Sequence, residues 1–118
     1  MKIEKPHERC LRLWKKLVKA RAGNKCEHCG GTKVIQANHA IPSTNWSLRF
    51  DERNGVALCY RCHFHWWHKN PIEAIQWFIE HRGRFEYDYL LLRKHSTAKN
   101  DYGLLEIYLE QKIKELEK

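Results

Sequence analysis

Apolar residues in the first part of the chain recur at three- and four-residue intervals, which is the spacing of one helix face. They are Cys10, Leu13, Trp14 and Leu17. Pro6 suits the first turn of a helix, where its missing N–H has no intrahelical partner, and Gly23-Asn24 suits the end. The pattern predicts a helix between Pro6 and Gly23 with one buried face.

Short apolar runs replace this spacing in the middle of the chain. Residues 32–37 and 56–58 predict two short strands, and Asn54-Gly55 before the second is typical of a hairpin turn. Turn-forming residues predict a loop over 42–51. A helix is expected from Cys59 to about Asn70, because a residue that precedes proline disfavours helical backbone.

Helical spacing returns after Asn70. Helices are predicted over 71–81 and 85–94 and from Asp101 onward, with breaks at Gly83 and at the polar linker 96–100. Their buried faces are expected to contain Ile72, Ile75, Phe78 and Ile79 in the first helix, and Leu105, Tyr108, Leu109, Ile113 and Leu116 in the last. We therefore expect an α+β protein that is mostly helical.

Four of the five cysteines form two CxxC pairs, Cys26 with Cys29 and Cys59 with Cys62. Two such pairs, with no secretory signal, favour a closed structural zinc site over disulfides. The fifth, Cys10, lies on the apolar helix face and is expected to be a buried structural thiol. At 118 residues the chain fits a single domain, 1–118, with a basic helix (1–24), a zinc core (25–70) and a helical C-terminal extension (71–118).

No apolar run approaches the roughly 18 residues that a membrane span needs, and the N-terminal residues lack the apolar segment of a signal peptide. We therefore expect a cytoplasmic protein that has no contact with a membrane. The five histidines of the zinc core and its immediate surroundings then become the main candidates for chemistry beyond zinc binding. They are His28, His39, His63, His65 and His68.

The net charge of +8 is concentrated at one end of the chain. Residues 1–25 contain nine basic and two acidic side chains, whereas the other 93 residues contain 13 basic and 12 acidic ones. Five of the basic residues form a stripe at helical spacing: Lys5, Arg9, Arg12, Lys16 and Lys19. Such a local excess is typical of a surface that binds a phosphate backbone, although a merely solvated helix face would look the same.

The stretch from Gln36 to His63 resembles the HNH endonuclease family, whose nuclease core is a zinc-stapled, treble-clef-like ββα-metal finger. The matching residues are 37–42 (Ala-Asn-His-Ala-Ile-Pro) and 54–63 (Asn-Gly-Val-Ala-Leu-Cys-Tyr-Arg-Cys-His). The chain also resembles the phage NinG/Rap-like recombination nucleases, through residues 48–51 (Leu-Arg-Phe-Asp) and Asn54. The resemblance implies a DNA nuclease in a bacterial or phage-infected cell, with branched recombination intermediates among its substrates.

The resemblance also implies roles for individual residues. His39 takes the general-base role, which suits an imidazole that is neutral near pH 7. His63 takes the role of ligand to a catalytic divalent cation, Mg²⁺ or Mn²⁺, with Co²⁺ or Ni²⁺ able to substitute. Asn54 matches an asparagine that braces the loop of the finger. The products would have 5′-phosphate and 3′-hydroxyl ends.

The sequence departs from the family at two places. Asn38 stands where many members have Asp or His as a second metal ligand, and an amide oxygen ligates a hard cation without contributing charge. Trp67 stands four residues after His63, where some relatives have another histidine. His65 and His68 are near this position without occupying it, and either could ligate the metal or contact phosphate.

These assignments leave alternatives open. His39 could be a buried structural histidine, and His63 could be an ordinary helix residue or replace one cysteine on zinc. Arg49 and Arg61 could hold the scissile phosphate or be ordinary surface residues. Trp46, in the loop, is a candidate for DNA contact.

We expect the partner to be double-stranded or branched DNA bound with low sequence specificity, because a basic stripe grips the backbone without reading bases. A symmetric junction would favour a homodimer. The alternative function is a non-catalytic, zinc-dependent DNA-binding protein that retains the HNH scaffold. RNA is a third candidate partner, since backbone contacts do not distinguish the two sugars.

Overall fold

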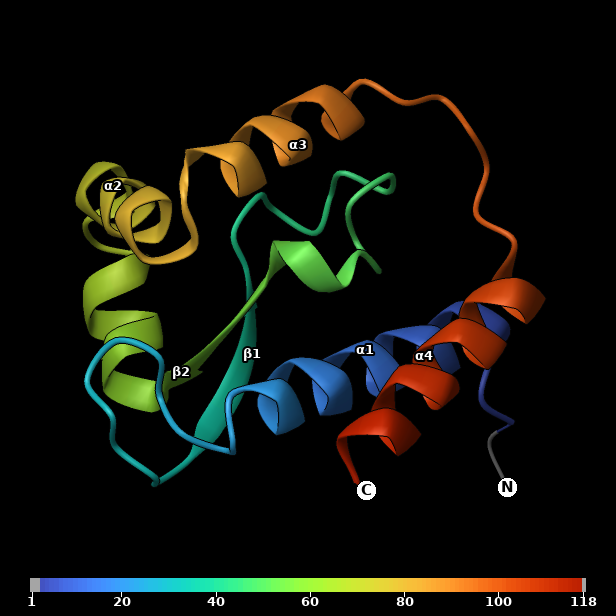
Figure 1. Ribbon diagram of the computed structural model, residues 1–118, viewed down its shortest axis with the longest axis horizontal. Helices are drawn as coiled ribbons and strands as arrows, with labels where there is room; N and C mark the ends of the chain where they lie inside the picture. The colour runs from blue at the N-terminus through green and yellow to red at the C-terminus, as the bar shows by residue number, and fades with distance from the viewer. Residues whose placement is uncertain (1–2, 118) are drawn as a thin grey trace.

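The computed structural model describes residues 3–117 and has an α+β architecture (Figure 1). The elements, in chain order, are helix α1 (Pro6–Arg21), strand β1 (Ile35–His39), the 3₁₀ turn η1 (Glu52–Asn54), strand β2 (Gly55–Cys59), the π-helix η2 (Arg61–Trp67), and helices α2 (Pro71–Arg82), α3 (Arg84–Lys94) and α4 (Tyr102–Leu116). No helix among these described residues combines the length and apolar composition needed to cross a bilayer.

The two strands form an antiparallel pair at the centre of the molecule, with Ile35 opposite Cys59 and His39 opposite Gly55. The side chains of β2 alternate between two apolar clusters because successive residues of a strand point to opposite faces. Val56 and Leu58 belong to a cluster with the second half of the chain, whereas Ala57 belongs to a cluster around α1. The first four residues of β2 are buried because helices cover both faces of the sheet.

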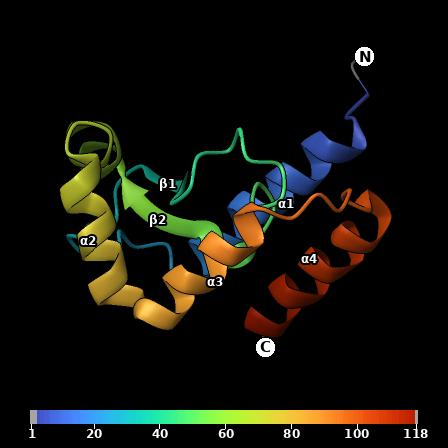
Figure 2. The ribbon, with the colours of Figure 1, turned by 90° about the horizontal axis from the view of Figure 1, so that it is seen from above.

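The helices lie in two groups on either side of this pair. Helix α4 packs against α1 although almost the whole chain separates them, and their proximity is visible in both ribbon views (Figures 1 and 2). Leu109 and Ile113 of α4 are buried with Trp14 of α1 in one cluster. Helices α2 and α3 follow one another on the other side, where Phe78 and Leu90 are fully buried.

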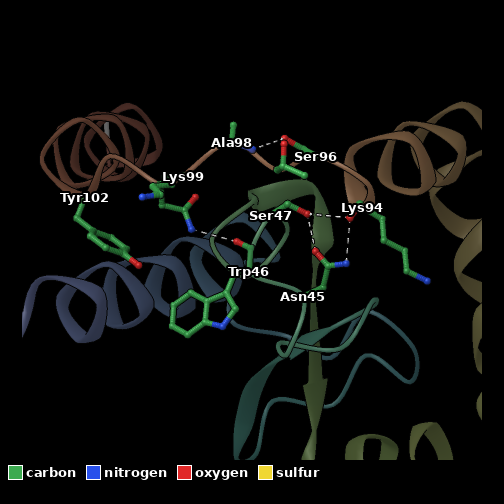
Figure 3. A pocket seen from close by; sticks show the side chains of 10 residues that line it. Asn45, Trp46, Ser47, Lys94, Ser96, Ala98, Lys99 and Tyr102 are labelled. Atoms are coloured by element: carbon green, nitrogen blue, oxygen red, sulfur yellow. Dashed lines mark hydrogen bonds between the residues drawn. The ribbon is translucent and has the colours of Figure 1, made fainter.

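The segment 95–101, which joins α3 to α4, is held against the loop between the strands (Figure 3). Asn45 Nδ2 donates to the carbonyl oxygen of Lys94 at 3.3 Å, and Asn100 Nδ2 donates to that of Trp46 at 3.1 Å. Asp101 then caps α4 by accepting from the backbone N–H of Leu104 at 3.1 Å. These contacts connect the C-terminal helix to the same loop that borders the candidate site.

Most predicted elements are present, but the hairpin turn at Asn54-Gly55 is wrong. Asn54 ends η1, and Gly55 begins β2 with an extended backbone. The glycine is required by packing rather than by a turn. A Cβ at this position would lie 2.2 Å from Cγ2 of Val18 and 3.0 Å from Cζ2 of Trp14, so that α1 could not approach the sheet so closely.

Two further expectations fail. The first strand begins at Ile35 rather than at Thr32, after Val34 adopts a positive φ of 51°, which is unusual for a β-branched residue. The predicted buried helix faces are also partly wrong, because Ile72 is 85% exposed and Tyr108 and Leu116 are about half exposed. In α2, Phe78 is fully buried as predicted and Ile75 and Ile79 are partly buried, whereas the buried Ala74 was not predicted.

Candidate metal centre and active-site cavity

The two CxxC pairs meet in space. The Sγ atoms of Cys26, Cys29, Cys59 and Cys62 all lie within 4.8 Å of one another. Within residues 3–117, this is the only group of three or more His, Cys, Asp or Glu side chains whose ligand atoms lie close enough to share a metal ion. The second pair follows β2 directly, and the first follows α1 by a short loop, so that the cluster joins both parts of the fold.

The geometry of the cluster fits a tetrahedral metal ion. A Zn–S bond of about 2.3 Å places neighbouring sulfurs of a tetrahedron about 3.8 Å apart, and Cys29 Sγ and Cys59 Sγ are 3.7 Å apart. Backbone N–H groups also point to the sulfurs: Cys29 N donates to Cys26 Sγ at 3.4 Å, and Cys62 N to Cys59 Sγ at 3.5 Å. Such donors stabilise thiolates, which are the form that binds metal.

The close packing of the four thiols also changes their pKa values. Burial raises the pKa of the Cys62 thiol, and hydrogen bonds with the other cysteines and the charge of Cys26 add to the effect. Burial also raises the pKa of Cys26, but backbone N–H donors from Cys29, Cys59 and His28 outweigh it and lower that pKa to about 7. Four thiolates this close repel one another unless a cation neutralises them. The cluster is therefore suited to a structural metal ion such as zinc.

His28, inside the first pair, connects the metal centre with η2. Its Nδ1–H donates to Cys62 Sγ at 3.3 Å, and its ring stacks on Trp66 with the ring centroids 3.6 Å apart. The fifth cysteine, Cys10, is buried in the cluster around α1, as expected, and its Sγ donates to the carbonyl oxygen of Tyr102 at 3.5 Å.

A cavity of about 570 Å³ opens beside the strand pair and contains the predicted catalytic residues. Asn38, His39, His63 and His68 all line it. Asn38 and Gln36 lie on the face of β1 that is turned to η2, and His39 stands at the end of the strand, where the loop begins. The fold thus places the candidate base, His39, and the candidate metal ligand, His63, around the same cavity.

His39 is fixed on two sides. Its ring stacks on Trp14 with centroids 4.0 Å apart, and its Nε2–H donates to the carbonyl oxygen of Arg49 at 2.9 Å. A carbonyl only accepts, so the neutral ring carries its proton on Nε2 and leaves Nδ1 free to accept another. Burial lowers the pKa of His39, and the charges of Arg49 and Lys15 add to this effect. The imidazole is therefore neutral, and available as a base, at neutral pH.

His63 is oriented by β1. Its Nδ1–H donates to Gln36 Oε1 at 2.8 Å, which leaves the lone pair of Nε2 for a metal ion. Burial lowers the pKa of His63 to about 4, with a contribution from the neighbouring His68. A ligand histidine must be neutral, and this one is neutral over the whole physiological range.

The π-helix brings His68 next to His63. In η2 the backbone N–H of His68 donates to the carbonyl oxygen of His63, five residues earlier, at 3.2 Å. A π-helix turn takes more residues than the 3.6 of an α-helix, so that position i+5 shares the face that i+4 occupies in an α-helix. The two ring centroids are 4.8 Å apart. His68 thus occupies the position next to His63 that Trp67 would occupy in an α-helix, and Trp67 is buried in the core instead.

Asn38 is buried, with 3% of its surface exposed, and its Nδ2 has no hydrogen-bond partner among the described residues. This atom is an N–H donor, so its partner would be an acceptor such as a water or a phosphate oxygen and not a cation. The groups around the cavity that can ligate a cation are the two imidazoles and the amide Oδ1 of Asn38.

Asn54 braces the loop that leads away from His39. It is fully buried; its Oδ1 accepts from Ile41 N at 2.7 Å, and its Nδ2 donates to the carbonyl oxygens of Ile41 at 2.9 Å and Leu48 at 3.2 Å. The asparagine therefore has a structural role: it fixes the loop that carries the carbonyl of Arg49, which in turn orients His39.

The predicted DNA-binding residues fall into different places. Arg9 forms ion pairs with Glu4 and with Glu106 of α4, at 3.5 and 3.3 Å. Lys16 lies 3.9 Å from Glu117, and Arg12 pairs with Glu4 at 2.9 Å.

Lys5 is exposed just before α1, and Lys19 lines a groove along that helix. Arg49 lines both the groove and the His39 cavity, whereas Arg61 lines a separate hollow beside Cys59. Lys15, absent from the predicted stripe, also lines the His39 cavity.

A second cavity of about 570 Å³ lies beneath the 95–101 segment (Figure 3). Its walls include Trp46, Lys94 and Lys99, but no His, Cys, Asp or Glu. It therefore has no side chain that could serve as a general base at neutral pH, and the chemistry is better placed at His39.

Comparison with known protein families, curated proteins and solved structures found no match to this chain. The function must therefore be argued from the cavity and its residues.

Proposed function

We propose that this protein is a metal-dependent DNA endonuclease with a ββα-metal core of the HNH type. The observation that carries the proposal is the cavity in which a neutral imidazole with a free Nδ1, that of His39, lies with the adjacent imidazoles of His63 and His68. The order of β1, β2 and η2 along the chain supports it, since it is the strand–strand–helix order of that core.

In this proposal His39 deprotonates the attacking water. Its Nδ1 accepts the proton, while Nε2–H stays bound to the carbonyl of Arg49, so that the charged imidazole is stabilised where it forms. The stacked indole of Trp14 keeps the ring from rotating. The resulting hydroxide attacks phosphorus, and the bond to the 3′ oxygen breaks, which gives 5′-phosphate and 3′-hydroxyl ends.

His63 and His68 would hold the catalytic cation, with Asn38 as a third, uncharged donor. A divalent ion held there would offset the charge of the phosphorane and of the departing 3′ oxygen. Gln36 positions His63 for this task through its hydrogen bond to Nδ1. The four cysteines would hold a separate structural zinc ion, which fixes the start of η2 and therefore the position of both histidines.

The basic surface next to the cavity supports a nucleic-acid substrate, and the resemblance to HNH endonucleases favours DNA over RNA. Backbone contacts carry little sequence information, so low sequence specificity is expected. Branched recombination intermediates are the first candidates, and a symmetric four-way junction would favour two copies of the protein acting as a homodimer.

The test is a cleavage assay with zinc-replete protein. Supercoiled plasmid, linear duplex and an end-labelled four-way junction are incubated with Mg²⁺ or Mn²⁺, and without added metal, and the product ends are analysed. We expect metal-dependent cutting that leaves 5′-phosphates. Tight DNA binding without cutting in any metal would contradict the proposal and support the non-catalytic DNA-binding alternative.

A further inference from the structure

Two surface features meet at Lys15 and Arg49. One is the cavity that contains His39. The other is a groove of about 510 Å³ that runs along α1, with Arg12, Lys16 and Lys19 also in its walls. Because Lys15, Arg49 and Leu11 line both, the groove leads directly into the cavity.

The charge on α1 is unevenly neutralised. On the side facing α4, Arg9 pairs with Glu106 at 3.3 Å. Lys16 lines the groove but also lies 3.9 Å from Glu117, so its charge is partly neutralised. In the groove, Glu4 is paired with Arg12 at 2.9 Å.

The ion pairs among residues 3–117 leave Lys15, Lys19 and Arg49 without a carboxylate partner. These three cations line the groove, against one carboxylate there without an ion pair, Glu8, so that the groove and the cavity beside it are net positive. Arg21, the other such cation of α1, instead donates to the carbonyl oxygens of Glu52 and Gly55.

Arg49 is held in place before any ligand binds. Its Nη1 donates to the carbonyl oxygen of Ser43 at 3.2 Å, and its guanidinium lies 4.6 Å from the ring centre of Trp46. Its Nε is buried and has no hydrogen-bond partner among the described residues. A fixed guanidinium with an unused donor is well suited to an anionic oxygen, for which its planar fork provides directed hydrogen bonds.

Resting on the proposed function, we propose that the DNA strand to be cut follows the α1 groove, and that Lys15 and Arg49 together hold the phosphate group next to His39. Lys19 lies one helical turn beyond Lys15, about 6 Å along the axis. A DNA strand rises about 3.4 Å per nucleotide, so that Lys19 would contact a phosphate within about two nucleotides of the one held by Lys15.

The first test is DNA binding without cutting, by fluorescence anisotropy of a labelled duplex over a range of salt concentrations, with no added divalent metal. Lys15→Gln removes one phosphate contact, so we expect several-fold weaker binding and a log–log salt slope smaller by about 1. The matched control is Arg9→Gln, on the same helix but paired with α4, which is expected to bind like the wild type. Both side chains lie at least partly on the surface, so both variants should fold.

The outcomes separate this inference from the proposed function. Equal binding and salt slope for Lys15→Gln and the wild type would overturn it, even if the wild type cuts DNA. Loss of binding in Lys15→Gln but not Arg9→Gln would support it, even if no metal produces cutting, in which case only the nuclease proposal would fail. Tighter binding to an RNA duplex of the same sequence than to DNA would overturn the assignment to DNA.

The second readout concerns position. If Lys15 holds the phosphate beside His39, Lys15→Gln will lower the cleavage rate at saturating DNA as well as the affinity. A residue that only attracts DNA from a distance would change the affinity and leave the saturated rate unchanged, and that result would remove Lys15 from the phosphate next to His39.

Discussion

Asn54 provides a sharp test of how the loop positions His39. Replacing it by Ala removes one acceptor and two donors from a fully buried site, and leaves Ile41 N and Ile41 O without their partner. Leu48 O loses one hydrogen bond but still accepts from Asp51 N at 3.2 Å. Each buried polar group left unsatisfied costs about 1–3 kcal/mol. With two such groups the expected loss is about 2 kcal/mol or more, against a total stability of about 5–15 kcal/mol for a domain of this kind.

Asn54→Asp tests the same hydrogen bonds through the pH dependence of stability, which the loss of buried side-chain volume alone would not change. The carboxylate could still accept from Ile41 N, but it would face the carbonyl oxygens of Ile41 and Leu48, to which it has nothing to donate. Burial next to two acceptors raises the pKa of such a carboxyl in the folded state. A raised folded-state pKa means that the acid stabilises the fold at low pH and that this stability is lost as the pH rises.

Urea titration of the zinc-replete variants, between pH 4 and 8, measures both effects. The matched control is Asn45→Ala, which removes the same side chain from the same loop at a more exposed position. Its cost should be about 1 kcal/mol, because it loses a solvent-accessible hydrogen bond to the carbonyl oxygen of Lys94. A loss below about 1 kcal/mol for Asn54→Ala, or an Asn54→Asp variant whose stability does not depend on pH, would refute the hydrogen-bond account of the loop.

Three further predictions concern the metals and the base. Protein purified without added zinc should contain about one zinc ion per chain, and Cys29→Ser should lower that content; none in the wild type would contradict the tetrahedral cluster. Calorimetric titration of zinc-replete protein with Mn²⁺ should give weaker binding for His68→Ala than for His65→Ala, and equal affinities would remove His68 from the metal site. Because burial lowers the pKa of His39 below its usual 6.5, the cleavage rate should fall with acidification only below that pH; an inflection above 6.5 would contradict a buried neutral base.

The sequence alone predicted the structure correctly where the local preferences of the residues and the tertiary packing favour the same conformation. Pro6 begins α1 and Asp101 caps α4, as predicted, and both strands lie close to their expected positions. The two CxxC pairs also meet as their spacing predicts. In these regions the chemistry of a single residue type, such as a proline without N–H or a thiol that binds metal, determines the local structure.

The features that the sequence did not predict depend on contacts between distant parts of the chain. Asn54-Gly55 has the local character of a turn, but the close approach of α1 to the sheet determines the conformation there. No periodicity rule predicted that η2 would be a π-helix, so that the sequence could not decide between His65 and His68 as the neighbour of His63. Lys15 lies at the edge of the basic stripe, and only the position of the Arg49 loop shows that it borders the cavity. A five-residue spacing between two histidines, directly after a metal-binding pair, was the one signal available.

The central claim is that His39 is the base of a nuclease, and cleavage by His39→Ala tests it most directly. Wild type, His39→Ala and the matched surface variant His65→Ala are compared on plasmid and four-way junction with Mn²⁺, after zinc content and thermal unfolding confirm that all three are folded. A positioned general base contributes about 10²–10⁴-fold to a rate. We expect a loss of this size in His39→Ala and none in His65→Ala; cleavage by His39→Ala within a few-fold of the wild type would contradict the account.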